Sequence, residues 1–284
     1  MRIFLFLMFF TSSLFLVAQD ELLDQVSASL DEGTIYANAT FKGTRLINGQ
    51  SVETRDKGSL VFIISHRFSN IDGGAYEFFG LDGAQIRLGL DYAITDDLYI
   101  GLARNSLGKT IDGFVKYRIL RQSKGDRVMP VSLTYFGSTA YQTLKTTPER
   151  SFSEKLAFTN QVLIARKITP DFSFQLMPSW VHYNLVAATD NNDVYALGFG
   201  GRYKLGNRFS LNAEYFLQLQ EKNSTYNNAF AIGFDIDTGG HVFQLHFTNA
   251  AAMIDKGFIG ETTDEFFSGD IRFGFNITRN FQLK

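Results

Sequence analysis

The chain has no cysteine among its 284 residues. This absence excludes a disulfide framework and a lipid-modified cysteine, so the fold must depend on packing or on its surroundings. A basic excess is also missing, because 27 Lys and Arg stand against 29 Asp and Glu, for a formal net charge of -2. Without such an excess there is no general electrostatic attraction for nucleic acid, and we expect no nucleic-acid partner.

Motifs for catalysis, metal binding and nucleotide binding are missing as well. The four histidines are scattered, with no HExxH pair, and no G-x-S-x-G elbow marks a serine nucleophile. Ala103–Thr110, ARNSLGKT, fits a relaxed phosphate-loop pattern, but the residues after it alternate as a strand instead of opening a helix. We therefore expect a hairpin loop at Ser106–Thr110 and predict no enzyme, cofactor, metal site or nucleotide partner, with a membrane-embedded hydrolase as the remote alternative.

The N-terminus indicates export. Met1–Ala18 combines an early Arg, an apolar run broken by Thr and Ser, and a small residue before Gln19, which is typical of a secretory signal peptide. A single transmembrane anchor is the competing interpretation, because the apolar part approaches spanning length. In residues 19–58, Asp20–Leu30 has helix-like spacing and Gly33–Gly58 has no clean period. We expect residues 19–58 to form a separate segment that lies in the periplasm or plugs a barrel.

From residue 59 onward the sequence has a period of two, the period of a β-strand. It predicts about twelve strands, most of them near the roughly nine to eleven residues that a tilted strand needs to cross a bilayer. They are Leu60–Phe68, Ala84–Ile94, Leu98–Asn105, Ile111–Leu120, Val131–Ala140, Leu156–Ile168, Phe172–Leu185, Val194–Leu205, Phe209–Gln220, Ala229–Asp237, His241–Ala250 and Asp270–Thr278.

The two faces of these strands differ in composition. Aromatic residues make up 15% of the chain, with 29 Phe and 12 Tyr, and many of them lie on one parity of the strands. The opposite parity mixes Gly, Ala, Ser, Asn and Gln with single charges, unlike the Lys/Glu-rich exterior of a soluble sheet. A continuous apolar face suits lipid, and small residues with isolated charges suit an enclosed lumen, so a membrane barrel is favoured over a soluble barrel or sandwich. Asn160 and His182 interrupt the apolar parity and suggest a bulge or shift there.

The connections alternate in length. Residues 95–97, 169–171, 206–208 and 238–240 are tight turns, whereas residues 69–83, 141–153, 186–193, 221–228 and 251–269 are longer and polar, and 121–130 is the one long member of the short set. Outer-membrane barrels show this alternation, with short periplasmic turns and long external loops. We predict an all-β fold, a single closed antiparallel transmembrane β-barrel of about twelve strands over residues 59–284, with a short pre-barrel segment.

Charged residues on the polar parity are the candidate lumen lining. They are Arg67, Arg87, Asp91, Asp112, Lys116, Arg118, Arg202, Glu214, Asp235, His246 and Arg272. One interpretation is a salt-bridge network that braces a filled barrel, since buried charges are costly unless paired. The other is a pore lining whose cationic excess favours anionic solutes.

Three stretches resemble a known family. They are TFKGTRLINGQSVETRDKGSLVFIISHRF, GGAYEFFGLDGAQIRLGLDYAITDDLYIGLARNSLGKTIDGFVKYR and PVSLTYFGSTAY. These stretches are similar to a family of outer-membrane β-barrels from Gram-negative bacteria that is catalogued as a domain of unknown function, and the resemblance covers essentially Asn38–Lys284. It implies a barrel and an outer-membrane location, and it implies no activity, substrate or site residue.

Two functions fit the sequence. The first is a passive channel or small-solute transporter with a charged lumen, whose partners are outer-membrane lipid and a small anionic solute. The second is a non-conducting structural or docking barrel whose N-terminal segment binds a periplasmic protein or fills the lumen.

Overall fold

The computed structural model describes residues 33–220 and 225–283. The predicted signal peptide, Met1–Ala18, and the predicted helix Asp20–Leu30 lie outside these residues. The chain divides into two compact units. In the smaller unit, strand β1 (Ile35–Tyr36) pairs antiparallel with β6 (Ser123–Lys124). Strand β6 lies in the connection 121–130, the one long member of the predicted set of short turns.

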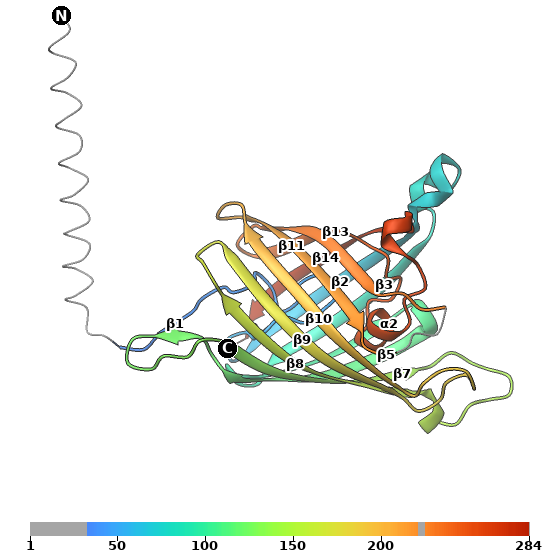
Figure 1. Cartoon of the computed structure of the whole chain (residues 1–284), viewed down its shortest axis with the longest axis horizontal. Coiled ribbons are helices and arrows are strands. Elements are labelled where there is room, and N and C mark those ends of the chain that lie inside the picture. Colours follow the sequence, from blue (N-terminus) through green and yellow to red (C-terminus); the bar gives the residue numbers. More distant parts are fainter. Residues whose placement is uncertain (1–32, 221–224, 284) are drawn as a thin grey trace, which may run out of the picture. The chain divides into compact units, whose positions relative to one another are not determined.

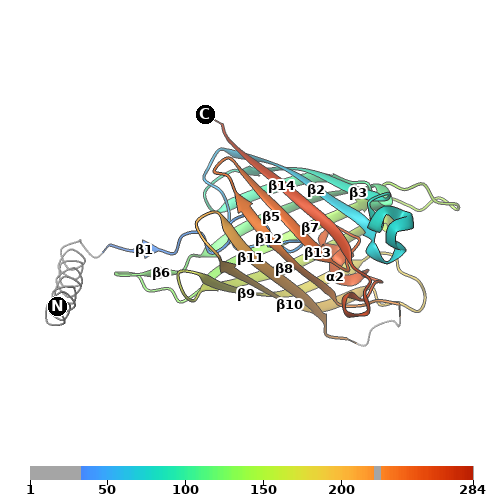
Figure 2. The same ribbon diagram turned by 90° about the horizontal axis from the view of Figure 1, so that it is seen from above.

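The larger unit is a closed antiparallel barrel, as predicted (Figures 1 and 2). In the described residues its twelve strands are β2 (Ser59–Asn70), β3 (Ala84–Ala93), β4 (Leu98–Asn105), β5 (Thr110–Leu120), β7 (Ser132–Gln142), β8 (Leu156–Lys167), β9 (Phe172–Tyr183), β10 (Asp193–Lys204), β11 (Phe209–Gln218), β12 (Ala229–Asp237), β13 (His241–Thr248) and β14 (Arg272–Gln282). Each pairs with its sequence neighbours, and β14 pairs with β2 to close the ring.

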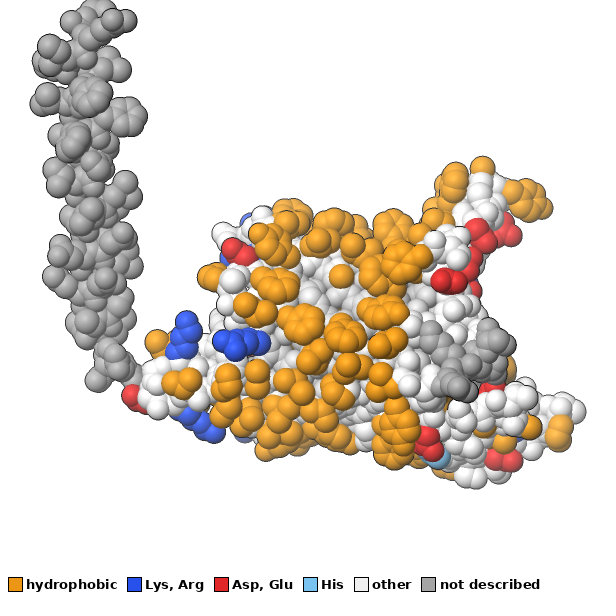
Figure 3. All heavy atoms as spheres, in the orientation of Figure 1, with side chains coloured by type: hydrophobic (Ala, Val, Ile, Leu, Met, Phe, Trp, Pro, Cys, Tyr) orange, Lys and Arg blue, Asp and Glu red, His pale blue; other side chains and the backbone are white. Residues whose placement is uncertain are grey.

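The alternation of the sequence becomes an apolar outside and a polar inside. In β3, for example, Leu88 and Leu90 are 43% and 52% exposed, whereas Arg87 and Asp91 are buried. Hydrophobic side chains gather over the face of the barrel wall that Figure 3 shows. Because successive side chains of a strand point to opposite faces, one register places most of the large aliphatic and aromatic groups outside, although some, such as Tyr99, Phe136 and Leu163, face inward and are buried.

The predicted bulge near Asn160 and His182 is wrong. Strand β8 keeps one register with β7 and with β9, and the register shifts lie instead in the β2–β14 and β5–β7 pairs. The polar groups on the outer face find partners there. Asn160 Oδ1 accepts a hydrogen bond from Tyr135 Oη at 2.6 Å, and His182 Nδ1 lies 2.8 Å from Asp193 Oδ1. These hydrogen bonds lower the free-energy cost of placing polar groups in an apolar surrounding, so the strand can keep one register.

Short helical turns occupy several of the connections. They are η1 (Ile71–Gly80), η2 (Leu107–Lys109), η3 (Ser153–Lys155), α2 (Asp255–Gly260) and η4 (Phe266–Ser268). The connection at 106–109 is tight and β5 follows it at once, so ARNSLGKT joins two strands as predicted. No helix in the described part of the chain is long and apolar enough to cross a membrane.

Candidate functional site: the filled lumen

The chain inserts its own residues 40–54 into the barrel, and we call them the plug segment. All of them are buried except Lys42 and Glu53, which are half-buried. The segment folds back on itself at residues 46–49, where Leu46 N donates to Gly49 O at 2.8 Å and a bridge joins Arg45 to Gln50. Its two limbs run back to Ala39 and to the start of β2, so the turn is the innermost part of the plug segment.

Glu214 on β11 holds this turn through main-chain atoms. Its carboxylate accepts hydrogen bonds from three successive N–H groups, those of Ile47 at 3.3 Å, Asn48 at 2.7 Å and Gly49 at 3.1 Å. Three convergent amides form a concave anion site of the kind that backbone turns provide. The buried carboxylate is thereby satisfied by the plug segment, and no cation of residues 33–220 or 225–283 is in hydrogen-bond contact with it.

Lys116 on β5 binds the same segment with the opposite polarity. Its ammonium is fully buried and donates to the carbonyl oxygens of Thr44 at 2.9 Å, Ser51 at 3.1 Å and Glu53 at 3.4 Å. An ammonium has three N–H donors, so these three carbonyls match its capacity. Lys116 therefore ties both limbs of the plug segment to one point on the wall.

Uncharged wall side chains complete the hold on the plug main chain. Gln175 on β9 accepts from Val52 N at 2.9 Å and donates to Gln50 O at 2.7 Å. The remaining main-chain contacts are Gln244 to Leu46 O at 2.6 Å, Asn276 to Ile47 O at 3.0 Å, Thr134 to Val52 O at 3.1 Å, and Arg202 to Ala39 O at 2.7 Å and Thr40 O at 3.3 Å. These partners come from strands around the whole ring, so the plug segment spans the lumen.

A second segment fills the other end of the lumen. Residues 249–262, which we call the α2 segment, are buried except for three half-buried positions, and α2 contacts β8, β9 and β11. Gln218 donates to Ile259 O at 2.9 Å, Tyr183 donates to Lys256 O at 2.7 Å, and the Phe258 ring lies 5.0 Å from the Phe216 ring. Figure 1 shows α2 within the outline of the barrel, at the end where the long connections lie.

The prediction that residues 251–269 form a polar external loop is therefore wrong for its first half. Residues 250–254 read AAAMI, and Phe258 and Ile259 follow after Asp255. Burying this apolar run removes it from water, which is the reason that it folds inward. This apolar run was the sequence signal for a buried segment, but it has no strand period and is too short to predict a helix.

Arg67 links the two inserted segments. Arg67 is 1% exposed, and its guanidinium donates to Asn48 Oδ1 of the plug segment at 2.7 Å and to Ala250 O of the α2 segment. Asp255 of the α2 segment is also buried. Burial raises the pKa of Asp255 to about 6, and the positive charge of Arg45 in the plug segment opposes that shift. The two segments are thus coupled by charge as well as by Arg67.

The other predicted lining residues have a range of partners. Arg87 and Asp112 form a buried two-point ion pair, at 3.1 and 2.5 Å. Asp91 accepts from Tyr99 Oη at 3.3 Å, and Asp235 accepts from Ser210 at 3.3 Å and Gln244 at 2.9 Å. The His246 side chain is buried, and neither of its ring nitrogens has a hydrogen-bond partner among the described residues. Arg118 and Arg272 are half-buried near opposite ends of the barrel and pair with Asp97 and Asp264.

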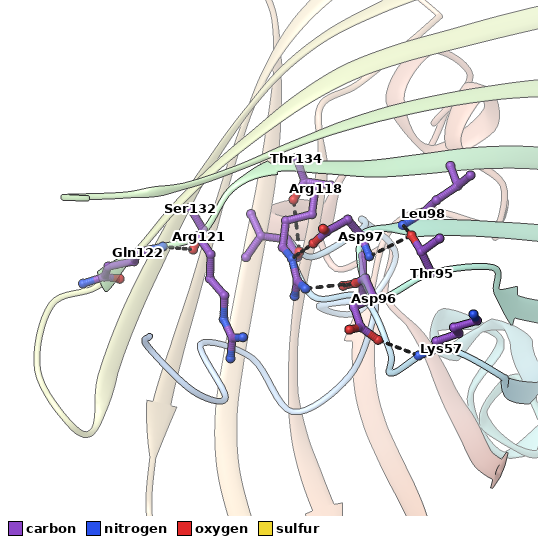
Figure 4. Close-up of polar contacts among 12 residues, drawn as sticks. Lys57, Thr95, Asp96, Asp97, Leu98, Arg118, Arg121, Gln122, Ser132 and Thr134 are labelled. Carbon is purple, nitrogen blue, oxygen red and sulfur yellow. Dashed lines mark hydrogen bonds and ion pairs between the residues drawn. The ribbon is translucent and has the colours of Figure 1, made fainter. Parts of the chain in front are cut away.

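The outgoing limb of the plug segment is clasped by the turn between β3 and β4 (Figure 4). Thr54 Oγ1 donates to Asp96 O at 2.7 Å, and Lys57 N donates to the Asp96 carboxylate at 2.8 Å. Arg118 stiffens the turn, donating to Asp97 Oδ1 at 2.8 Å and to Asp96 O at 2.9 Å. The plug segment is therefore anchored where it joins the barrel, and its turn is the part farthest from this anchor.

Two cavities lie on either side of the inserted segments. The outer cavity, about 630 Å³, is lined by Tyr183, Gln218 and the end of α2 at Gly260, together with residues 185–187 and 189–191. The inner cavity, about 300 Å³, is lined by residues of both plug limbs and by Arg118. The α2 segment lines the outer cavity and the plug segment lines the inner one, so the two inserted segments separate the two cavities.

These observations define a membrane-bound β-barrel whose own chain closes its lumen. The chain belongs to the membrane-bound β-barrel domain family DUF5777, which it matches over residues 41–281, as the resemblance in the sequence indicated. No curated protein sequence matches the chain.

Solved outer-membrane proteins are similar to this chain in structure, and the NanC porin shares its barrel fold. The NanC porin is 10% identical with a TM-score of 0.50, and the match covers 79% of this chain and 100% of the porin. The KdgM porin is 10% identical with a TM-score of 0.48, over 78% and 99% of the two chains. An outer-membrane channel of Pseudomonas putida F1 is 13% identical with a TM-score of 0.49, over 81% and 98%. At these identities the likeness concerns the barrel fold alone.

Proposed function

We propose that this protein is a solute-transport barrel of the Gram-negative outer membrane, exported by its signal peptide and closed at rest. The observation that carries the proposal is the pair of cavities, 630 and 300 Å³, separated by inserted segments that the wall holds through hydrogen bonds. Passage of a solute then requires the plug segment and the α2 segment to move aside. The porin-like fold supports a transport role, in which loops and inserted segments occlude a barrel lumen.

The buried wall charges favour neither sign of solute charge. The buried wall charges comprise four cations, Arg67, Arg87, Lys116 and Arg202, and four anions, Asp91, Asp112, Glu214 and Asp235. The predicted cationic excess, and with it the preference for anionic solutes, has no support in this balance. Most of these groups bind inserted main chain or each other.

The test is single-channel conductance of the folded protein in a planar bilayer. An opened variant combines Leu46→Asp and Gly49→Asp with replacement of residues 251–262 by a short Gly-Ser linker. Gly49→Asp places a carboxylate beside Glu214, because a Cβ at Gly49 would lie 3.3 Å from Glu214 Oε2 and 2.9 Å from Phe216 Cζ. Each change acts on an inserted segment and leaves every wall residue unaltered.

We expect the wild type and the two single-segment variants to stay closed, since the segments lie in series, and the opened variant to conduct. Asn38→Asp is the matched control, because it adds charge at an exposed position just outside the plug segment and should leave the barrel closed. If the opened variant is inserted and folded, as judged by heat-modifiable migration, but stays silent, the transport proposal fails and a structural or docking barrel takes its place.

A further inference from the structure

The wall recognises the plug segment chiefly as a polypeptide main chain. Seven wall residues bond its main-chain atoms or those of Ala39, and they are Thr134, Gln175, Arg202, Glu214, Gln244, Asn276 and Lys116. Glu214 accepts only from N–H groups, Lys116 donates only to C=O groups, and Gln175 does both within three residues. Every peptide without proline at these positions presents the same groups.

The wall also has a hollow for one side chain of the plug segment, next to the main-chain contacts. Gly200 leaves a hollow in β10 that Leu46 fills, because a Cβ at Gly200 would overlap the Leu46 side chain, whereas the space at Gly198 is taken by Phe216 and Met177 of the wall. Met177 lines the hollow, and its flexible thioether adapts to different apolar shapes. Main-chain hydrogen bonds beside a pocket for one side chain are the arrangement by which proteins bind extended or turned peptides.

We propose that the lumen is a binding site for oligopeptides and that the plug segment is its resident occupant. The ligand is a turned peptide with an apolar residue in the β10 hollow and glycine three positions later, as Leu46 and Gly49 are spaced. This inference rests on the proposed function, since a foreign peptide reaches the wall only when the plug segment has left. It names peptides as the solute class that the wall is built to hold.

A plug segment that only closes the lumen would also need hydrogen-bond partners for its buried main chain, so the test must use foreign peptides. The receptor is the opened variant, whose wall is intact. The first probe is a synthetic peptide of unrelated sequence that keeps only the Leu-x-x-Gly spacing. The second is the same peptide N-methylated at the three amides that would face Glu214, which removes donors and leaves the side chains unchanged. Maltohexaose is the non-peptide probe.

We expect the unmodified peptide to block the current of the opened variant, and the N-methylated peptide to block at least about tenfold more weakly, because several hydrogen bonds to charged or buried groups are lost. Gln175→Ala in the same background should weaken block by a similar factor. Gln161→Ala is its control, because Gln161 is an equally buried lumen-facing glutamine on β8 that bonds Ser179.

Two results would overturn the inference. One is an opened variant that conducts while the unmodified peptide blocks no better than the N-methylated peptide or maltohexaose, in which case transport stands and peptides are not the ligand. The other result is equal binding of the unmodified and the N-methylated peptide, which would contradict main-chain recognition. It applies if the opened variant is folded but silent, so that the transport proposal has failed, and it is measured by fluorescence anisotropy of the labelled peptides on the solubilised variant.

Discussion

At the scale of single residues, the charged groups of the lumen wall serve the inserted chain. Lys116 and Glu214 have no ion-pair partner within 4.0 Å among the described residues, and each is satisfied by three main-chain groups of the plug segment. Buried charges of this kind are costly if their partners leave. An opened lumen would hydrate both groups, and that hydration lowers the free-energy cost of moving the plug segment.

The glycines of β10 offer a direct test of plug packing. In Gly200→Ala the new Cβ meets Leu46, and we expect the closed state to lose roughly 1–3 kcal/mol of stability, as overpacked sites do. Gly201→Ala is the control on the lipid-facing side of the same strand, where the nearest atoms lie 3.9 and 4.0 Å from a Cβ. The measurement is the rate of tryptic cleavage at Arg55 and Lys57 in the folded barrel. Leu46→Ala in the Gly200→Ala background should restore protection, and an absence of rescue would contradict the contact.

At the scale of elements, the two inserted segments differ in how they are held. The plug segment is covalently continuous with β2 and clasped by Asp96, whereas the α2 segment is a loop between β13 and β14 held by Gln218, Tyr183 and Arg67. Both lack regular secondary structure over most of their length. Wall side chains therefore supply the partners that a helix or sheet would supply internally.

Docking of the α2 segment should depend on pH through Asp255. Because burial raises the pKa of Asp255 to about 6, from 3.8, the docked state binds a proton more readily than the undocked state, and Arg45 opposes this preference while Asp112 adds to it. Docking is then weakest above pH 6 and strengthens as the pH falls toward 4, by at most about 3 kcal/mol. Hydrogen exchange of the α2 amides, corrected for intrinsic pH effects, measures this. Asp255→Asn should abolish the dependence, and an unchanged profile in that variant would rule out Asp255.

At the scale of the whole molecule, the barrel separates an apolar exterior from a filled interior that holds the buried charged and polar side chains together with an apolar cluster. A barrel of twelve strands has a lumen that the wall side chains alone do not fill, and residues 40–54 and 249–262 occupy the remaining space. The interior is thereby packed with polar contacts and with buried apolar groups such as Leu46, Phe136 and Phe258, while the exterior presents the apolar face that Figure 3 displays.

The exterior should respond to charge according to depth in the bilayer. Leu88→Arg, near the middle of β3, should destabilise the folded barrel in phospholipid vesicles by roughly 2–4 kcal/mol, because a cation in the hydrocarbon is desolvated. Ile94→Arg, just beyond the end of the same strand, should cost only about 0–1 kcal/mol, because its side chain reaches the interface. Equilibrium unfolding in urea gives both values. Equal costs at the two positions would contradict the assignment of the strand to the membrane.

The sequence by itself determined the class of fold, because a period of two is a local property: successive side chains of a strand face opposite sides whatever they pack against. Leu98–Asn105 and Ala229–Asp237 were predicted with the bounds that the structure has, and all twelve strands were found. The same parity indicated which charged residues point inward, but not what they bond. Only the tertiary structure decided that Glu214 and Lys116 hold the plug segment and that α2 folds into the lumen, because the contacts of Asn48 with Glu214 join residues 166 positions apart. Irregular segments have no period for a local pattern to report, and their placement follows from the space and the partners that the closed barrel provides.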